Sequence, residues 1–306
     1  MLIDARAYAL LSEFVVHRHA IFERRYGLEN DVEPNVVFDR LHFANVFRVL
    51  DRSSQFLLRE VIYDEPRPLQ STIWRVMFYR WFNKPATWER LCAAGLELEY
   101  GQDPGELRAA LDAMKAAGYA PTTSAYYVPA IYGGKAPNYA SWCEGTSRMV
   151  DVVAPVLDAL SPAKALYDAL KSVPGVGVFI AHQLAVDLMY TPFGQHLSED
   201  DYFLPGPGCK EGAMKVFPDL APREVPDAVR YLRDTQEVWL PGFGGLFGRQ
   251  LTLSDVEHAL CEMTRYARVR SSALAEGALG SNYTRRYKPT GSDLELVLPP
   301  HWRLNV

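Results

Sequence analysis

Residues 162–190 read PAKALYDALKSVPGVGVFIAHQLAVDLMY. Apolar side chains recur at helical spacing on both sides of Val173-Pro174-Gly175-Val176-Gly177, which predicts two helices joined by a tight turn. In a helix-hairpin-helix, glycines let the turn backbone approach a phosphate, and N–H groups at the start of the second helix hold the anion. Such contacts position a protein on DNA without reading its sequence. A plain interhelical turn explains the same residues, and the small Ala181 in the second helix does not decide between the two.

Helical spacing continues through most of the chain, so we predict a mostly α-helical protein with a helix-hairpin-helix at its centre. A segment rich in Thr, Tyr and Val, 119–132, is expected to form at most a minor β-hairpin. We expect a single domain with lobes at about 1–140 and 141–280, followed by a tail, 281–306. The further helices are expected over 4–26, 36–61, 71–83, 87–94, 103–117, 141–160, 224–238 and 254–270.

Composition limits the classes of function. The chain has 306 residues, of which 48% are hydrophobic, enough for a sizeable core. A net charge of −5 gives no global attraction to nucleic acid, so DNA binding must rest on a local basic face and backbone amides. The four cysteines lie far apart, and we predict no metal, cofactor or disulfide framework. No apolar run is long enough to span a bilayer, so we expect a cytoplasmic protein without a membrane partner.

An acidic cluster and a Gly-Pro-Gly turn follow the hairpin in 198–212, SEDDYFLPGPGCKEG. Asp201 lies about where helix-hairpin-helix DNA glycosylases carry their catalytic aspartate, and its carboxylate could accept a proton beside a base held out of the stack. Gly206 and Gly208, with Lys210, could hold phosphate or pyrophosphate. The P-loop pattern GxxxxGK[ST] is absent, which argues against a kinase. A solvated acidic loop followed by a turn explains either half alone.

Residues 256–268, VEHALCEMTRYAR, carry polar side chains at helical spacing. On a helix, His258, Glu262 and either Arg265 or Tyr266 share one face. Such a face could hold a substrate. An exposed, salt-bridged stripe on an otherwise apolar helix would show the same spacing.

A third polar group stands in 43–55, FANVFRVLDRSSQ. If this stretch is helical, Asn45, Arg48 and Arg52 fall on one face, and Asp51 can pair with Arg48. Guanidinium groups suit bidentate binding of phosphates. A buried ion-pair network that ties two lobes together is the alternative, and the residues alone leave both open.

Taken in order, these stretches resemble the phage enzymes of thymine hypermodification called alpha-glutamyl/putrescinyl thymine pyrophosphorylases, or amino acid:DNA transferases. The resemblance runs from about residue 36 to about residue 270. The helical domain of that family is similar to the one accompanying 5-hydroxymethyluracil DNA kinases and is considered a divergent DNA-glycosylase fold. Where the family commonly has a Lys before the Tyr of its CE-x-x-KY phrase, this chain has Arg265, and Thr264 replaces an acid.

The resemblance implies a reaction on double-stranded DNA whose modified base is flipped out of the stack. An amino acid or polyamine would displace pyrophosphate from 5-(pyrophosphoryloxymethyl)uracil. Asp201 first and Glu262 second are the candidate catalytic carboxylates that take the ammonium proton. The residues nominated to bind DNA backbone are Pro174, Gly175, Val176 and Gly177. Those nominated to bind pyrophosphate or substrate are Asn45, Arg48, Asp51, Arg52, Gly206, Gly208, Lys210 and Tyr266.

Two other functions fit the same residues. A DNA glycosylase would use the hairpin and Asp201 equally well, although no lysine follows the turn in its second helix, which argues against a bifunctional lyase. A non-catalytic DNA-binding module would leave Asp201 and Glu262 as surface acids. The candidate partners for stacking an extruded base are Tyr126, Tyr127, Trp142 and Tyr202, although a buried core aromatic is the default explanation for each of them.

Overall fold

The computed structural model describes residues 1–123, 127–274 and 295–304. Within these ranges the regular secondary structure is helical and no strand is formed, which confirms the mostly α-helical prediction. One isolated antiparallel bridge joins Leu246 and Arg249. Of the helices that are described, none combines the length and the apolar character needed to cross a membrane.

The chain forms two compact units, each built from segments far apart in the sequence. The first combines 1–51 with the described part of 204–296, and the second combines 52–203 with 297–303. These bounds differ from those of the expected lobes, since α4 (Leu69–Phe82) and α7 (Asn138–Asp158) pack against each other inside the second unit. The single-domain organisation stays a prediction.

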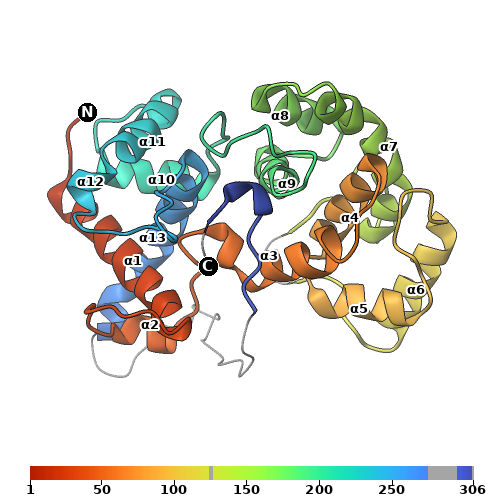
Figure 1. The fold of residues 1–306 in the computed structure, drawn as a ribbon, viewed down its shortest axis with the longest axis horizontal. Helices are drawn as coiled ribbons and strands as arrows, with labels where there is room; N and C mark the ends of the chain where they lie inside the picture. The colour runs from red at the N-terminus through yellow and green to blue at the C-terminus, as the bar shows by residue number, and fades with distance from the viewer. Residues whose placement is uncertain (124–126, 275–294, 305–306) are drawn as a thin grey trace. The chain divides into compact units, whose positions relative to one another are not determined.

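The first unit is built around α13 (Leu253–Leu274). Val256, Ala259, Leu260 and Met263 of this helix are fully buried, as expected of a helix enclosed by others. A Cβ at Gly212 would overlap the backbone carbonyl of Leu260, so glycine is required for close packing there. The surrounding helices in Figure 1 are α1 (Ala5–Arg25), α2 (Val36–Arg40), α10 (Pro207–Val216), α11 (Val225–Asp234) and the short α12 (Gln236–Trp239).

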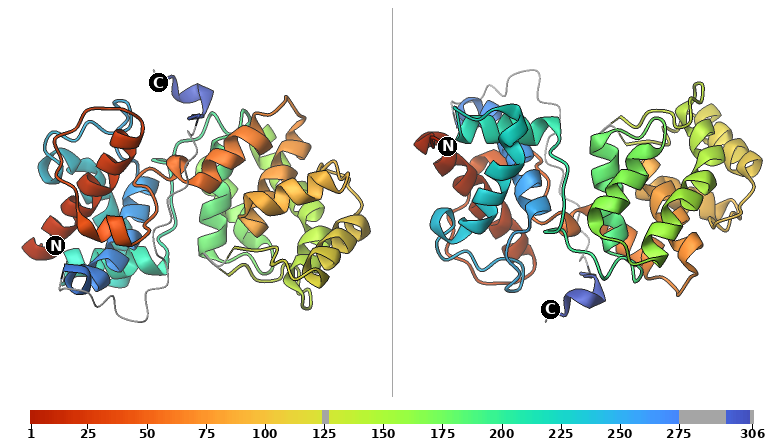
Figure 2. Two further views of the ribbon diagram at one scale, coloured as in Figure 1. Left: turned by 90° about the horizontal axis from the view of Figure 1, so that it is seen from below. Right: turned by 90° about the horizontal axis from the view of Figure 1, so that it is seen from above.

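The second unit is built around α4, the aromatic stretch that the sequence predicts as an internal helix. Every residue from Ser71 to Phe82 is buried. Figure 2 shows this unit from two sides, with α4 against α7. The Trp81 indole donates to the hydroxyl of Thr146 on α7 at 2.9 Å. The remaining helices of this unit are α3 (Arg52–Phe56), α5 (Pro85–Ala93), α6 (Pro104–Ala116), α8 (Ala163–Ser172) and α9 (Val178–Met189).

The helix predicted over 36–61 is wrong, because the chain there is interrupted. After α2 an extended stretch leads to η1 (Arg48–Leu50), then to α3 and to η2 (Leu57–Ile62), a π-helix. Both the backbone N–H and the side-chain amide of Asn45 donate to Asp51 Oδ1, at 2.8 and 3.0 Å. Such local side-chain bonds offer the backbone an alternative to helix. The common helical face expected for Asn45, Arg48 and Arg52 is therefore not formed.

Residues 119–132 form no strand in the part that the structure describes, so the possible hairpin is not seen there. Instead the N–H of Ile131 donates to Ser141 Oγ at 3.0 Å, and that of Tyr132 to Pro174 O at 2.8 Å. In the tail, Val297 exchanges backbone bonds of 2.9 and 3.0 Å with the side chain of Gln55. The expected basic cluster of Arg285, Arg286 and Lys288, like Tyr126, lies outside the described residues.

An ion pair in the second unit has almost no contact with solvent. Arg80 on α4 donates to Asp187 on α9 at 2.5 and 2.9 Å, and the two side chains are 3% and 0% exposed. Removing one partner of such a pair leaves the other charge buried and uncompensated.

We therefore expect Asp187→Ala to lower the free energy of unfolding by about 3–5 kcal/mol, measured by urea denaturation. Asp168→Ala is the matched control, because Asp168 pairs with Lys164 at 2.6 Å on the surface of α8. Exposed pairs of this kind contribute about 0–1 kcal/mol. Equal losses for the two variants would show that the buried pair contributes no more than a surface pair.

Candidate functional site

Two buried glutamates of α13 anchor neighbouring segments of the first unit. Glu257 and Glu262 are 7% and 6% exposed. Glu257 accepts the N–H of Gly206, at the start of α10, at 2.9 Å. Glu262 accepts the N–H of Ala44 at 3.1 Å and also pairs with Arg265 one turn along the helix. Each carboxylate thus fixes a loop against α13 while it is held out of water.

The environments of these two glutamates move their pKa values in opposite directions. Burial raises the pKa of Glu257, and the Gly206 N–H and nearby positive charge offset this only in part. Burial also disfavours charge on Glu262, but Arg265, His258 and the Ala44 N–H together hold the pKa of its carboxyl below the ordinary value. Carboxyl groups whose pKa values are pushed apart can divide the roles of proton donor and proton acceptor.

The loop of residues 42–51 lies beside these acids. Arg48 is 6% exposed and close enough to Glu257 to lower the pKa of that carboxyl. His42 interacts electrostatically with both Asp51 and Glu262, which places the Asn45–Asp51 loop near Glu262. The structure therefore places the Asn45–Asp51 loop near Glu262 and Arg48 near Glu257.

His258 adds a further polar group to α13. Its Nε2 atom is buried and has no hydrogen-bond partner among the residues that the structure describes. No three His, Cys, Asp or Glu side chains within that same part of the chain gather as metal ligands would. The polar side chains at or near α13 named so far are carboxylates, an imidazole and guanidinium groups.

The Gly-Pro-Gly turn begins α10, and its glycines have packing roles. Gly206 donates its N–H to Glu257, so a protein carboxylate already holds this N–H. A Cβ at Gly208 would overlap Cys261 Sγ of α13. Lys210 is exposed on the first turn of α10. Among Gly206, Gly208 and Lys210, the residues of this segment predicted to bind pyrophosphate, Lys210 has an exposed cationic side chain.

Tyr266 lies in the core. It is fully buried and donates its hydroxyl to Glu13 at 2.5 Å, while Asn35 donates to that hydroxyl at 2.8 Å. Its ring stacks on Phe38, and burial together with Glu13 raises the pKa of Tyr266 to about 12. In this arrangement its polar atom is occupied by protein, and contact with a substrate stays a prediction.

The other nominated residues belong to the second unit. Asp201 is exposed, and its Oδ2 accepts the N–H of Ser198 at 2.8 Å, so the carboxylate closes a surface turn. Arg52, at the start of α3, is also exposed. The predicted catalytic acids Asp201 and Glu262 therefore come from different units.

The predicted hairpin is present as α8, a turn of residues 173–177, and α9. Gly175 has a φ of +93°, and a Cβ there would overlap the carbonyl of Ala130. Packing against the 130–132 segment thus explains this glycine. Around Gly177, the N-cap of α9, the space for a Cβ is open. A DNA-backbone contact at this turn stays a prediction.

Comparison with known proteins identifies the family of this chain. The model of the family described as "5-hmdU DNA kinase, helical domain" matches residues 5–276 and so reaches into both units. The chain belongs to this family. A 5-hmdU DNA kinase from Bacillus phage SP10 is 25% identical over an alignment of 278 positions, and this alignment covers 82% of this chain and 43% of the relative. The chain thus spans less than half the length of that kinase. No solved structure matches it.

Membership of the 5-hmdU DNA kinase helical-domain family confirms the relation to these kinases that the resemblance implies. Membership of the amino acid:DNA transferases stays a prediction. Sequence reasoning nominated neither Glu257 nor the buried Glu199, which accepts the Tyr190 hydroxyl at 3.4 Å. The sequence feature that could have identified Glu257 is its position next to the apolar Val256 in a helix predicted to be part of the core. A lone acid there must find donors when it is buried.

The opposite pKa directions on α13 can be tested by unfolding measurements. At pH 7 we expect Glu262→Gln to cost about 1–3 kcal/mol, because a charge-assisted bond and an ion pair are lost. Because the pKa of Glu262 is lowered in the folded protein, its ionised carboxylate stabilises the fold fully at pH values above the ordinary pKa of 4.5. This stabilisation is lost as the pH falls through the lowered pKa. The parent and Glu262→Gln should therefore converge on acidification.

Glu257→Gln is the matched control on the same helix. In the parent protein the pKa of Glu257 is raised in the folded state, so ionisation of this carboxyl at pH 7 lowers the free energy of unfolding. In the variant, the amide oxygen of glutamine can still accept the Gly206 N–H. We expect this variant to be as stable as the parent or more stable at pH 7. The electrostatic description of α13 is wrong if both variants lose the same free energy at every pH.

Proposed function

We propose that this chain modifies hydroxymethyluracil in DNA by letting an amine displace pyrophosphate from the methylene carbon on C5 of the base. The observation that carries the proposal is the family match over residues 5–276, together with the relative named as a kinase of 5-hmdU DNA. The order of sequence stretches that resembles amino acid:DNA transferases supports the specific reaction. The absent P-loop pattern makes phosphorylation by this chain a poorer fit.

The proposed step forms one bond and breaks one. The amine nitrogen attacks the methylene carbon with its lone pair, a C–N bond forms, and the C–O bond to pyrophosphate breaks with its electrons leaving on oxygen. The ammonium proton that results passes to a carboxylate. Cations near the departing pyrophosphate stabilise its growing charge.

The side chains support a division of these roles. Asp201 is the first candidate for proton acceptor, because its carboxylate is exposed, and Glu262 is the second, because its pKa is lowered and it stays ionised. Lys210 and Arg52 are exposed cations suited to pyrophosphate. Arg48 is buried beside Glu257, where its positive charge acts to lower the pKa of that carboxyl against the larger effect of burial.

A second candidate is a DNA-binding module without catalysis of its own. It is favoured by the family description, since the matching part of these kinases is called their helical domain. In that function the hairpin of α8 and α9 would contact the DNA backbone. Base excision, the third possibility, would use the same hairpin with Asp201.

One reaction distinguishes these functions. The protein is incubated with duplex DNA containing 5-(pyrophosphoryloxymethyl)uracil and a mixture of amino acids and polyamines, and the digested nucleosides are analysed by mass spectrometry. We expect an amine adduct with release of pyrophosphate, and no adduct on DNA containing thymine. Abasic sites would establish the glycosylase, and binding with unchanged bases would establish the module.

We expect Asp201→Asn to lower the rate of adduct formation by at least about 10²-fold, the range of general acid–base catalysis. Asparagine keeps an oxygen that can accept the Ser198 N–H, so the turn and the DNA affinity should persist. Asp168→Asn, an exposed acid on α8, is the control and should leave the rate unchanged. A rate for Asp201→Asn equal to that of the parent would remove this residue from the mechanism.

A further inference from the structure

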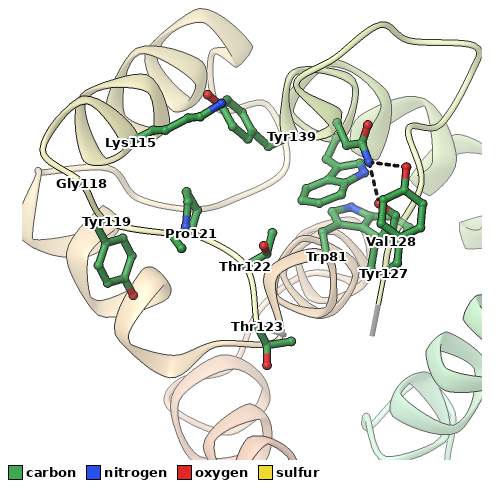
Figure 3. Close-up of a pocket in the computed structure, with 13 residues that line it drawn as sticks. Trp81, Lys115, Gly118, Tyr119, Pro121, Thr122, Thr123, Tyr127, Val128 and Tyr139 are labelled. Carbon is green, nitrogen blue, oxygen red and sulfur yellow. Dashed lines mark hydrogen bonds between the residues drawn. The ribbon is translucent and has the colours of Figure 1, made fainter. Parts of the chain in front are cut away.

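The second unit contains a pocket of about 670 Å³, and its lining includes Tyr127 and Trp142, two of the aromatic residues predicted from the sequence as stacking partners for an extruded base. The candidate catalytic carboxylates and pyrophosphate-binding residues do not line it. Small-molecule sites commonly occupy about 300–1,000 Å³, so the space suits an organic ligand. Figure 3 shows the chain from Tyr119 to Thr123 along one wall, with Trp81, Tyr127 and Val128 on the opposite side. Every lining residue lies in the second unit.

Aromatic rings form the floor and one rim of this pocket. Trp81 and Trp142 are 1% and 2% exposed, and their indole N–H groups donate within the protein to Thr146 Oγ1 and Pro129 O, each at 2.9 Å. Both indole N–H groups are therefore already used within the protein. Tyr127 is 76% exposed, and Asn138 Nδ2 donates to its hydroxyl at 3.0 Å. A large ring is thereby held at the mouth with its surface open to solvent.

The charged groups about the pocket are mainly cationic. Lys115 lines it, and no acid stands among the described lining residues. Lys84 Nζ and Arg90 Cζ lie 3.9 and 4.3 Å from the centroid of the Tyr119 ring, another wall residue. Asp112, which accepts the Tyr139 hydroxyl at 2.5 Å, is itself paired with Arg108 at 3.7 Å. An anion is favoured here over a polyamine.

We propose that this pocket binds a nucleotide, with its base stacked on Tyr127 and its phosphate directed to Lys115. A planar base suits the aromatic rim, since every base has a face that stacks on such rings. Thr122 adds a hydroxyl group for the base edge. A purely apolar ligand would leave Lys115 and this hydroxyl unused, and a cation would be repelled. The nucleotide belongs either to a DNA strand or to a free nucleoside monophosphate.

Binding is measured by calorimetry on the whole chain with thymidine monophosphate, thymidine, inorganic phosphate and a short single-stranded oligothymidylate. We expect Tyr127→Ala to weaken binding by at least about fivefold, the lower end of a base–aromatic stacking contribution. Lys115→Gln should weaken the binding of thymidine monophosphate and leave the binding of thymidine unchanged. Both side chains are exposed, so the variants should fold as the parent does.

Tyr100→Ala is the matched control, because Tyr100 is an exposed tyrosine of the same unit whose hydroxyl donates to Asp151 at 2.7 Å outside the pocket. Binding of the monophosphate that is sensitive to Tyr127 supports a free nucleotide as ligand. Binding of the oligonucleotide alone, with the same sensitivity, supports a DNA strand. The proposal is overturned if neither ligand binds, or if Tyr127→Ala and Tyr100→Ala bind equally well. Because binding is read without turnover, failure of the amine transfer would not alter this result.

Discussion

A carboxylate that leaves water must find hydrogen-bond donors, and this requirement organises the first unit. Glu257 and Glu262 are buried in α13, and each takes a backbone N–H from a different segment: Gly206 at the start of α10, and Ala44 in the loop after α2. The two acids thereby fix the loops that carry the polar residues of the candidate site. The second unit meets the same requirement at Asp187, where the donor is the guanidinium of Arg80.

Helical periodicity predicted the elements whose apolar stripe is continuous. The helices α1, α4, α6 and α13 begin and end within a few residues of their expected bounds. It failed over 36–61, since bonds from Asn45 to Asp51 close a loop there. The spacing of apolar residues carries no information about these bonds, because they join polar groups of two residues six positions apart.

Site residues were harder to predict than helices. The sequence nominated Glu262 and Arg48; Glu262 is a buried residue of α13, and Arg48 lies near Glu257 of the same helix. It also nominated Tyr266, whose ring and hydroxyl are enclosed by protein. The glycines of the hairpin and of the Gly-Pro-Gly turn suggested phosphate, yet Gly175 and Gly208 each adjoin protein atoms that leave no space for a Cβ. Glycine spacing cannot tell which surface comes close to the backbone.

The order of segments along the chain has a consequence for synthesis on the ribosome. Residues 52–203 are inserted between the two halves of the first unit, whose central helix, α13, begins only at Leu253. When translation reaches residue 203, nearly all of the second unit has been made. By then α1 and α2 of the first unit have also been made, but α13, which packs against both of them, has not. Domains generally fold as they emerge. Residues 1–51 therefore wait for α13 before their apolar faces can be covered, although they precede the whole second unit along the chain.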